Sequence, residues 1–452
     1  MAMMLVANRG VRSALAAAVP CILFLGVYLT AVGRGFLKDD FGWIAGARVE
    51  SWHDVLGLFT TNVGFYRPLV SLTFAADHAL WGLNPVGYGM TNLALALAGA
   101  AALYALVRRL ALPRHAALLA ASVWALNFHA VNMALLWLSG RTALLLVLFA
   151  LATAHAMLRG RHLLAGVCCL CALLSKEEAV ALPLLWTVYT DLTTRGPGTG
   201  SLPIRLGRTW PLWAALGLYA VLREQSGAFS AANAPSYYQF SFAPALVARN
   251  AAEYADRAGT TAAIAILVLL AATGWRRLRF EPAERRAALL AALWIPASYA
   301  LTLFLPVRSS LYALLPSIGA ALLAAVAASS AARARPEHVR RATAALLVLV
   351  LLLAPVYLAR NRRWTEAADL SSAVMTIVQK AVTARPGGGH VALLEDPDAR
   401  FTADVVFSGQ FPVAVTLFSD GTWTGSVVAP GETFPPGSLV IALRGEQPIV
   451  LD

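Results

Sequence analysis

The sequence predicts an all-α polytopic membrane protein with about eleven transmembrane helices and a small β-rich C-terminal domain. Composition gives the first evidence: of the 452 residues, 59% are apolar and 13% are charged, with a mean hydropathy of +0.65. Soluble globular domains are far less apolar. Apolar runs of helical length also recur along the chain. After Arg363 they give way to short apolar segments between Gly, Pro and Asp residues.

Each apolar run approaches the roughly 20 residues that a helix needs to cross a bilayer. Arginines gather in every second loop between the runs, and basic loops stay cytoplasmic. This alternation predicts a multi-pass protein of the inner (plasma) membrane with a cytoplasmic N-terminus and an extracytoplasmic C-terminus. The runs lie near 13–33, 88–107, 115–131, 140–158, 162–175, 178–191, 209–223, 260–274, 287–305, 309–330 and 342–359. The basic loops carry Arg9, Arg12, Arg108, Arg109, Arg114, Arg159, Arg161, Arg195, Arg205, Arg208, Arg276, Arg277, Arg279, Arg285, Arg286, Arg333, Arg335, Arg340 and Arg341.

Charge and cysteine content narrow the functional classes. The net charge is +12, but its placement in short clusters between apolar runs argues against nucleic acid as a partner. The four cysteines lie inside apolar runs and are interpreted as small core residues. No small-residue cleavage site follows the first run, so we interpret that run as a retained span.

Residues 1–362 are expected to form a transmembrane domain with extracytoplasmic loops near 34–87 and 224–258. The first loop contains an amphipathic stretch at 49–60 and an apolar stretch at 68–81 that suits an interfacial position. Residues 363–452 are expected to form an extracytoplasmic helix, over 366–382, and a β-rich cap. Its predicted strands are 405–407, 413–417 and 439–443.

Charged and aromatic residues that could carry chemistry cluster on the predicted outer side. Lys176, Glu177 and Glu178 follow one another between two apolar runs. Three ionised side chains at a helix centre would cost on the order of 8–10 kcal/mol, so they must pair or face water. The pattern fits two interpretations: the three side chains form a structural ion pair, or Lys176 binds an anionic group. The other candidates, each with a structural alternative, are Asp39, Asp40, Tyr66, Arg67, Tyr237, Tyr238, Arg308, Tyr312 and, at the start of a run, Arg141.

Outer carboxylates beside outer cations, at the edge of a bilayer, suit glycosyl transfer from a polyprenyl-phosphate sugar. The leaving phosphate needs Arg or Lys, and the acceptor hydroxyl needs a carboxylate to accept its proton. A monophosphate leaving group can be stabilised by cations alone, so no cofactor is required. A divalent cation at Asp39 and Asp40 remains open, whereas His53 and His78 match no metal-ligand spacing.

The ordered motifs Asp-Asp-Phe, Tyr-Arg-Pro-Leu, Gly-Leu-Asn-Pro-x-Gly-Tyr-x-x-x-Asn, Trp-Leu-Ser-Gly-Arg, Leu-Leu-Ser-Lys-Glu and Arg-Ser-Ser-Leu-Tyr-x-x-x-Pro resemble a known family. It comprises the bacterial relatives of the transmembrane O-mannosyltransferases that usually carry tetratricopeptide repeats, within the GT-C superfamily. The resemblance covers about residues 35–320. It implies an inverting, polyprenyl-phosphate-sugar-dependent hexosyltransferase that uses membrane-bound substrate. If the family's residue roles apply here, Asp39 or Asp40 is the base, and Lys176 and Arg308 hold the donor phosphate. The residues expected to line the site are Tyr66, Arg67, Glu177, Glu178, Tyr237, Tyr238 and Tyr312.

Two departures from the family pattern leave alternatives open. Met133 stands where relatives often place an acid, and the repeat domain is replaced by the C-terminal tail. Mannose is therefore only the sugar that the relatives suggest, and the acceptor could be a protein, a glycolipid or a polysaccharide. A lipid-linked oligosaccharide transferase or polymerase is an alternative. A transporter or flippase is another, although no internal duplication supports it.

Overall fold

The computed structural model describes residues 18–60, 64–194, 207–229, 233–274, 279–396, 398–444 and 447–451. Arg9, Arg12, Arg195, Arg205, Arg276 and Arg277, which entered the topology prediction, lie outside these residues.

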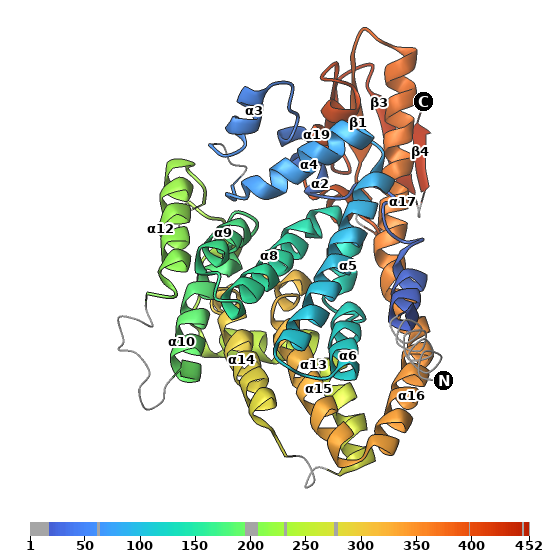
Figure 1. The fold of residues 1–452 in the computed structure, drawn as a ribbon. Helices are drawn as coiled ribbons and strands as arrows, with labels where there is room; N and C mark the ends of the chain where they lie inside the picture. The colour runs from blue at the N-terminus through green and yellow to red at the C-terminus, as the bar shows by residue number, and fades with distance from the viewer. Residues whose placement is uncertain are drawn as a thin grey trace, which may run out of the picture.

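The described part of the chain is mainly helical, with one small sheet near the C-terminus (Figure 1). Every predicted apolar run contains helix. The first described helix is Ala18–Tyr28. The α-helices of the main body that follow it are α2 (Asp40–Gly46), α3 (Trp52–Gly57), α4 (Pro68–Trp81), α5 (Pro85–Arg109), α6 (Arg114–Ala125), α7 (Val131–Leu136), α8 (Arg141–Leu158), α9 (His162–Leu173), α10 (Leu182–Thr194), α12 (Trp210–Gln225), α13 (Pro244–Thr273), α14 (Pro282–Ser298), α15 (Pro316–Ala334), α16 (Pro336–Leu352) and α17 (Ala354–Ala384).

Short 3₁₀ helices lie between several of these helices. They are η1 (Leu138–Gly140), η2 (Glu177–Ala181), η3 (Ser236–Tyr238), η5 (Thr302–Phe304) and η6 (Ser310–Ala313). Of these, η1, η2 and η6 adjoin the charged motifs at Arg141, Glu177 and Arg308. Irregular backbone is tolerated at membrane depth only where protein or water satisfies its polar groups. These turns therefore mark places where several helices meet.

Four helical segments among the described residues are long and apolar enough to cross a bilayer. A fifth is added if α16 and α17, which meet at a bend of 41°, count as one span. Other runs form shorter helices, such as α9. The predicted number of about eleven spans therefore stays a prediction, as does the orientation of the termini. The four segments are Pro85–Arg109, Leu138–Leu158, Pro244–Thr273 and Ser310–Ala334.

The C-terminal sheet has the strand order β2-β1-β3-β4. Strand β1 (Gly389–Leu394) pairs in parallel with β2 (Trp423–Val428) and β3 (Leu439–Arg444). Strand β4 (Gln447–Leu451) pairs antiparallel with β3. A parallel β1–β2 pair needs a crossover, and α18 (Ala403–Phe407) and α19 (Phe411–Phe418) provide it. The tail is thus a small α/β unit.

Two predicted strands were wrong: residues 405–407 lie in α18 and residues 413–417 lie in α19. Short apolar runs do not separate a strand from a buried helix by periodicity alone. Local signals favour helix here, because the Thr402 side chain caps α18 and Pro412 occupies the first turn of α19. The strand prediction at 439–443 is confirmed by β3, and the helix predicted at 366–382 is confirmed by α17. The apolar stretch at 68–81 forms helix α4.

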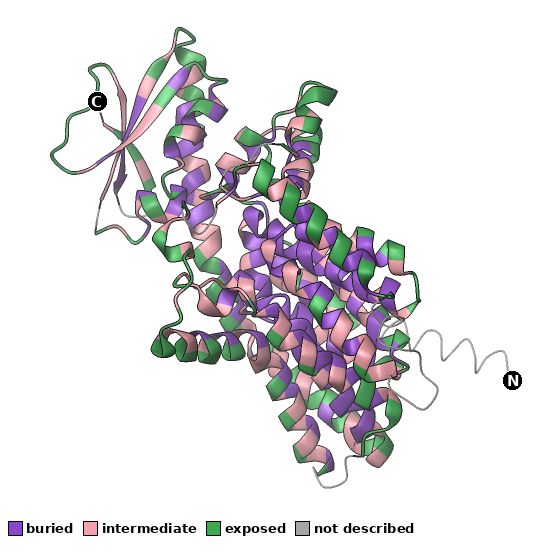
Figure 2. Ribbon diagram, turned by 90° about the vertical axis from the view of Figure 1, so that its left-hand side faces the viewer, coloured by how far each residue is buried: buried purple, intermediate pink, exposed green. Residues whose placement is uncertain are grey.

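The segment at residues 36–58 and the C-terminal unit share one hydrophobic core. Phe41 at the start of α2 packs against Phe407 and Phe418, with ring centroids 5.7 and 6.3 Å apart. Phe36 also contacts Phe418. Buried residues fill this interface as well as the interior of the helical body (Figure 2). The tail therefore positions the segment that carries Asp39 and Asp40.

Candidate active site

Asp39 and Asp40 occupy different environments although they are adjacent. Lys38, directly before them, has φ of +52°, a left-handed conformation that is strained for a residue other than glycine. Its N–H donates to the Val406 carbonyl at 2.9 Å, which ties this turn to the C-terminal unit. Asp39 then stands at the N-cap of α2 without making a side-chain cap, and Asp40 begins the helix.

Asp40 is fully buried, and both of its carboxylate oxygens accept hydrogen bonds. One carboxylate oxygen accepts from the Leu37 N–H at 2.8 Å, and the other accepts from the N–H of Ser139 at 2.7 Å and from its hydroxyl. Burial raises the pKa of Asp40 to about 7, and the hydrogen bonds from Ser139 and Leu37 only partly oppose that shift. The Asp40 side chain therefore holds the loop before α2 in place and is not accessible to solvent.

Asp39 is exposed. The protein around the Asp39 carboxyl group nevertheless keeps part of it from solvent, and this partial burial raises its pKa. The positive charges of Lys38 and Arg67 lower the same pKa. Asp39 also lies within electrostatic range of the Tyr238 hydroxyl. Of the acidic pair, Asp39 is thus the residue that is accessible to solvent. A cation shared by both carboxylates would have to displace the donors that already occupy Asp40.

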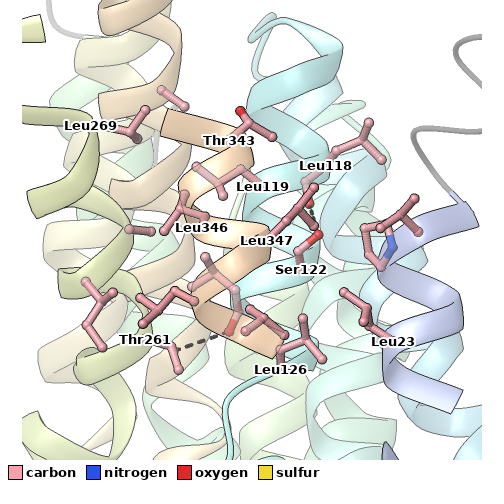
Figure 3. Close-up of a pocket in the computed structure, with 18 of the residues that line it drawn as sticks. Leu23, Leu118, Leu119, Ser122, Leu126, Thr261, Leu269, Thr343, Leu346 and Leu347 are labelled. Atoms are coloured by element: carbon pink, nitrogen blue, oxygen red, sulfur yellow. Dashed lines mark hydrogen bonds between the residues drawn. The ribbon is translucent and has the colours of Figure 1, made fainter. Parts of the chain in front are cut away.

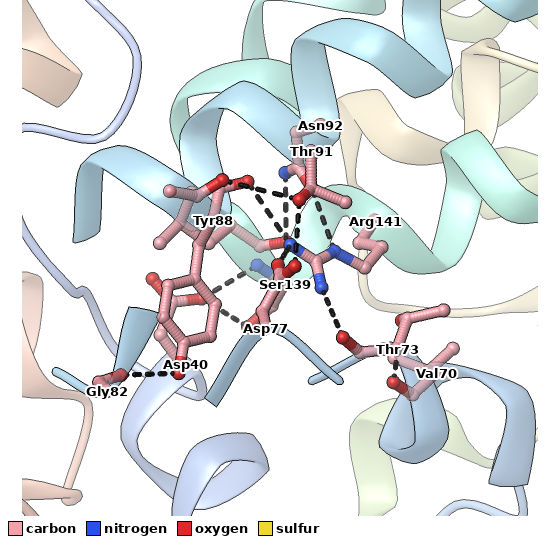
Figure 4. Close-up of polar contacts among 12 residues, drawn as sticks. Asp40, Val70, Thr73, Asp77, Gly82, Tyr88, Thr91, Asn92, Ser139 and Arg141 are labelled. Atoms are coloured by element: carbon pink, nitrogen blue, oxygen red, sulfur yellow. Dashed lines mark hydrogen bonds and ion pairs between the residues drawn. The ribbon is translucent and has the colours of Figure 1, made fainter. Parts of the chain in front are cut away.

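The segment Trp137-Leu138-Ser139-Gly140-Arg141 holds the acidic loop in place. The Trp137 indole donates to the Leu37 carbonyl at 3.3 Å, and Ser139 binds Asp40. Arg141 is fully buried and pairs with Asp77 at 2.5 Å, while its Nε donates to Asn92 at 2.9 Å (Figure 4). Each polar group of this motif therefore has a structural partner.

Arg67 and Glu177 form the central ion pair of the site. Arg67 donates through Nη2 to Glu177 Oε2 at 2.7 Å and through Nε at 3.1 Å, a two-point contact. Arg223 approaches the other Glu177 oxygen at 3.5 Å. The Arg67 guanidinium also lies 4.2 Å from the centre of the Phe65 ring. Arg67, which directly precedes α4, is thereby joined to η2 and to the end of α12.

Lys176 and Glu178 form a second, more deeply buried pair. Lys176 Nζ lies 2.8 Å from Glu178 Oε1 and 4.8 Å from the centre of the Tyr312 ring. Burial lowers the pKa of Lys176, and the charge of Glu178 opposes that shift. Its side chain is only 3% exposed. An anionic ligand could therefore reach Lys176 only if the pair with Glu178 loosened.

Arg308 lies in a third cluster, where it pairs with Glu253 of α13. The Tyr254 ring connects this cluster to the previous one, because it contacts the edge of Tyr312, with centroids 6.2 Å apart. Tyr254 also lies within electrostatic range of Glu178 and Arg308. Arg67, Lys176 and Arg308 thus lie in three neighbouring clusters, and Asp39 lies within electrostatic range of Arg67.

The tyrosines predicted to line the site differ in accessibility. Tyr66 is buried and donates to the Phe59 carbonyl at 2.9 Å, so its hydroxyl points to the protein. Tyr237 is 51% exposed, and its ring lies 4.7 Å from that of Tyr238. Burial raises the pKa of Tyr238, which keeps its hydroxyl protonated and able to donate near Arg67.

Sequence reasoning missed Arg223, Glu253 and Tyr254. Glu253 carries a signal that could have identified it, because Arg249 and Arg257 lie four residues before and after it, the spacing of helical ion pairs. Arg223 ends an apolar run in the same way as ordinary interfacial arginines do. Its contact with Glu177, 46 residues away, is decided by tertiary structure.

An apolar groove lies apart from the charged clusters. It has a volume of about 320 Å³ and runs between α6, α13, α16 and the helix Ala18–Tyr28 (Figure 3). Leu23, Leu119, Leu269 and Leu346 are among its lining residues, and none of the charged residues described above lines it. Its surface suits a hydrocarbon chain. Among the described residues, no group of three or more His, Cys, Asp or Glu is arranged to hold a metal ion.

No protein-family model matches the chain, and no curated relative matches it. Among solved structures, ArnT from Cupriavidus metallidurans bound to undecaprenyl phosphate is 14% identical, with 97% of each chain covered and a TM-score of 0.48. The apo state of that protein is 16% identical, with 92% of this chain and 75% of that chain covered and a TM-score of 0.46. Likenesses this distant do not establish a function for this chain.

Proposed function

We propose that this chain is an integral-membrane glycosyltransferase that moves a sugar from a polyprenyl-phosphate donor to an acceptor hydroxyl at the extracytoplasmic face. One observation carries the proposal: an exposed carboxylate, Asp39, lies within electrostatic range of Arg67, and further cations from distant segments of the chain lie in the clusters next to Arg67. Arg67 pairs with Glu177, and Tyr312 and Tyr254 lie between the cluster of Lys176 and that of Arg308. Mannose remains the sugar suggested by the sequence resemblance.

In the proposed reaction, Asp39 accepts the proton of the acceptor hydroxyl as that oxygen attacks the anomeric carbon of the donor sugar. The bond between that carbon and the phosphate oxygen breaks, and its electron pair leaves with the polyprenyl phosphate. Attack opposite to the leaving group inverts the anomeric centre. General-base assistance of this kind contributes about 10²–10⁴-fold to a rate.

Arg308 is the better placed of the two predicted phosphate ligands. Its side chain is 26% exposed, whereas that of Lys176 is 3% exposed and already paired with Glu178. Arginine also presents a planar set of donors that matches phosphate oxygens. We assign Lys176 to the electrostatic stabilisation of the leaving phosphate and Arg308 to direct contact with it.

The test is an assay of the purified full-length protein with a panel of polyprenyl-phosphate sugars and candidate acceptors. We expect transfer from at least one donor, and we expect Asp39→Asn to abolish most of it. Binding of donors without transfer to any acceptor, combined with movement of the lipid across vesicles, would instead support the flippase alternative.

A further inference from the structure

Three arginines share one carboxylate on the outer part of α13. Arg249 and Arg257 approach Glu253 at 3.1 and 3.0 Å from the same helix, and Arg308 approaches it from the segment before η6. The neighbouring carboxylate in sequence, Asp256, faces His129 at 3.9 Å and accepts from Thr260 at 2.6 Å. Three guanidinium groups against one carboxylate leave an excess of positive charge, which favours the binding of a further anion.

Among Glu177, Glu178 and Glu253, the paired carboxylates described above, Glu253 has the most exposed side chain. Its side chain is 29% exposed and that of Arg308 is 26% exposed, whereas Lys176 and Glu178 are 3% and 7% exposed. Partly exposed ion pairs are weak because water and salt compete with them. An incoming anion would therefore exchange with Glu253 more readily than with Glu178.

Tyr254 provides a second, independent observation. The residue is fully buried, and its hydroxyl has no hydrogen-bond partner among the residues that the structure describes. That hydroxyl lies within electrostatic range of Arg257, Arg308 and Glu178. A buried hydroxyl without a partner is unfavourable and calls for an explanation. A ligand oxygen beside Arg308 would supply the missing acceptor.

We propose that Glu253 is a displaceable counter-ion: it occupies the phosphate position at Arg308 until the donor's phosphate replaces it, and Tyr254 then donates to a phosphate oxygen. This inference rests on the proposed function and names the side chains that bind the polyprenyl phosphate. Phosphate oxygens match the guanidinium donors as well as a carboxylate does and carry more charge. When Glu253 returns to Arg308 after transfer, it helps to expel the polyprenyl phosphate product.

The experiment measures binding of a polyprenyl monophosphate to the purified full-length protein in detergent, together with thermal melting. We expect Glu253→Gln to bind about five- to tenfold more tightly than the wild type, a difference typical of one lost competitor. Glu253→Asp retains the charge on a shorter side chain that reaches Arg308 less well, so its affinity should lie between the two. Equal or weaker binding by both variants would overturn the proposal.

Two further variants separate this role from a purely structural one. Tyr254→Phe removes a hydroxyl that has no partner, so we expect unchanged or higher melting but about fivefold weaker binding. Unchanged binding would remove Tyr254 from the site. The control Glu281→Gln disrupts a comparable pair with Arg333 at 3.1 Å and should leave binding unchanged.

Titration with inorganic phosphate alone tests whether the ligand is a lipid. We expect the same rank order of variants at much weaker affinity, and equal affinity for free phosphate and lipid would overturn the lipid assignment. A wild-type protein that binds no polyprenyl phosphate would instead overturn the proposed function.

Discussion

Asp40 and Ser139 lie 99 residues apart and are joined by two hydrogen bonds, since both the N–H and the hydroxyl of Ser139 donate to one Asp40 oxygen. This contact fixes the start of α2 against the turn η1 that precedes α8. Because Asp39 is the residue before Asp40, the same contact fixes the backbone that presents Asp39. The buried acid positions the exposed one.

Replacing Asp39 by Asn should lower sugar transfer by about 10²-fold or more, because the neutral amide cannot accept the acceptor's proton. Thermal melting should be unchanged, since Asp39 is exposed and makes no cap hydrogen bond. Steady-state transfer assays with melting curves check both expectations. Glu50→Gln, at another exposed carboxylate of the same segment, is the matched control. Equal activity of the wild type and Asp39→Asn would remove the base assignment.

The pH dependence of transfer should carry the signature of Asp39. The base must be ionised, so activity should fall as pH decreases through its pKa, which burial raises above the usual 3.8. Lys38 lowers this pKa. Replacing Lys38 by Gln should therefore move the acid limb of kcat/KM to higher pH, and Lys38→Arg should leave it in place. An acid limb that is identical in all three proteins would contradict the interaction.

Replacing Asp40 by Asn should destabilise the fold by about 1–3 kcal/mol, because the amide NH₂ would face N–H and O–H donors and leave buried groups unsatisfied. Thermal or chemical unfolding measures the loss. Ser139→Ala should show a smaller loss and little further effect in the double variant, since both changes remove the same contact. Full additivity of the two losses would argue that they act separately.

The Asp40 substitution also predicts a pH trend. The folded-state pKa of about 7 lies above the usual 3.8, so the folded state binds the proton more tightly than the unfolded state. The resulting stability is present at low pH and is lost as pH rises through 7. The stability advantage of the wild type over Asp40→Asn should therefore shrink between about pH 4 and pH 7. An advantage that grows with pH would contradict this environment for Asp40.

Replacing Asp77 by Asn should be strongly destabilising, by about 3–5 kcal/mol, because it leaves the buried Arg141 guanidinium without its counter-charge. The double variant Asp77→Leu, Arg141→Met removes both charges and should recover part of the loss. Unfolding experiments on the three proteins check this order. A double variant less stable than Asp77→Asn would show that the remaining Arg141 contacts, to Asn92 and the Thr73 carbonyl, outweigh the ion pair.

The local sequence pattern was sufficient to predict those helices and motifs that have strong apolar periodicity or clear charge patterns. The helix at 366–382 followed from its sequence pattern, and the motifs carrying Arg67, Lys176 and Arg308 were visible as charge between apolar runs. The strands predicted at 405–407 and 413–417 were helices, because a short apolar run fits either conformation. The Thr402 cap and the position of Pro412 are the local signals that favour helix there.

The sequence by itself determined that this chain is built from apolar helices and that charged motifs interrupt them at a few points. It did not determine which neighbouring acid is exposed, since Asp40 is buried in part by its contacts with the distant Ser139. Nor did it show that Arg308 is already paired with Glu253. Burial and ion pairing depend on residues that are far apart along the chain, and only the tertiary structure brings those residues together.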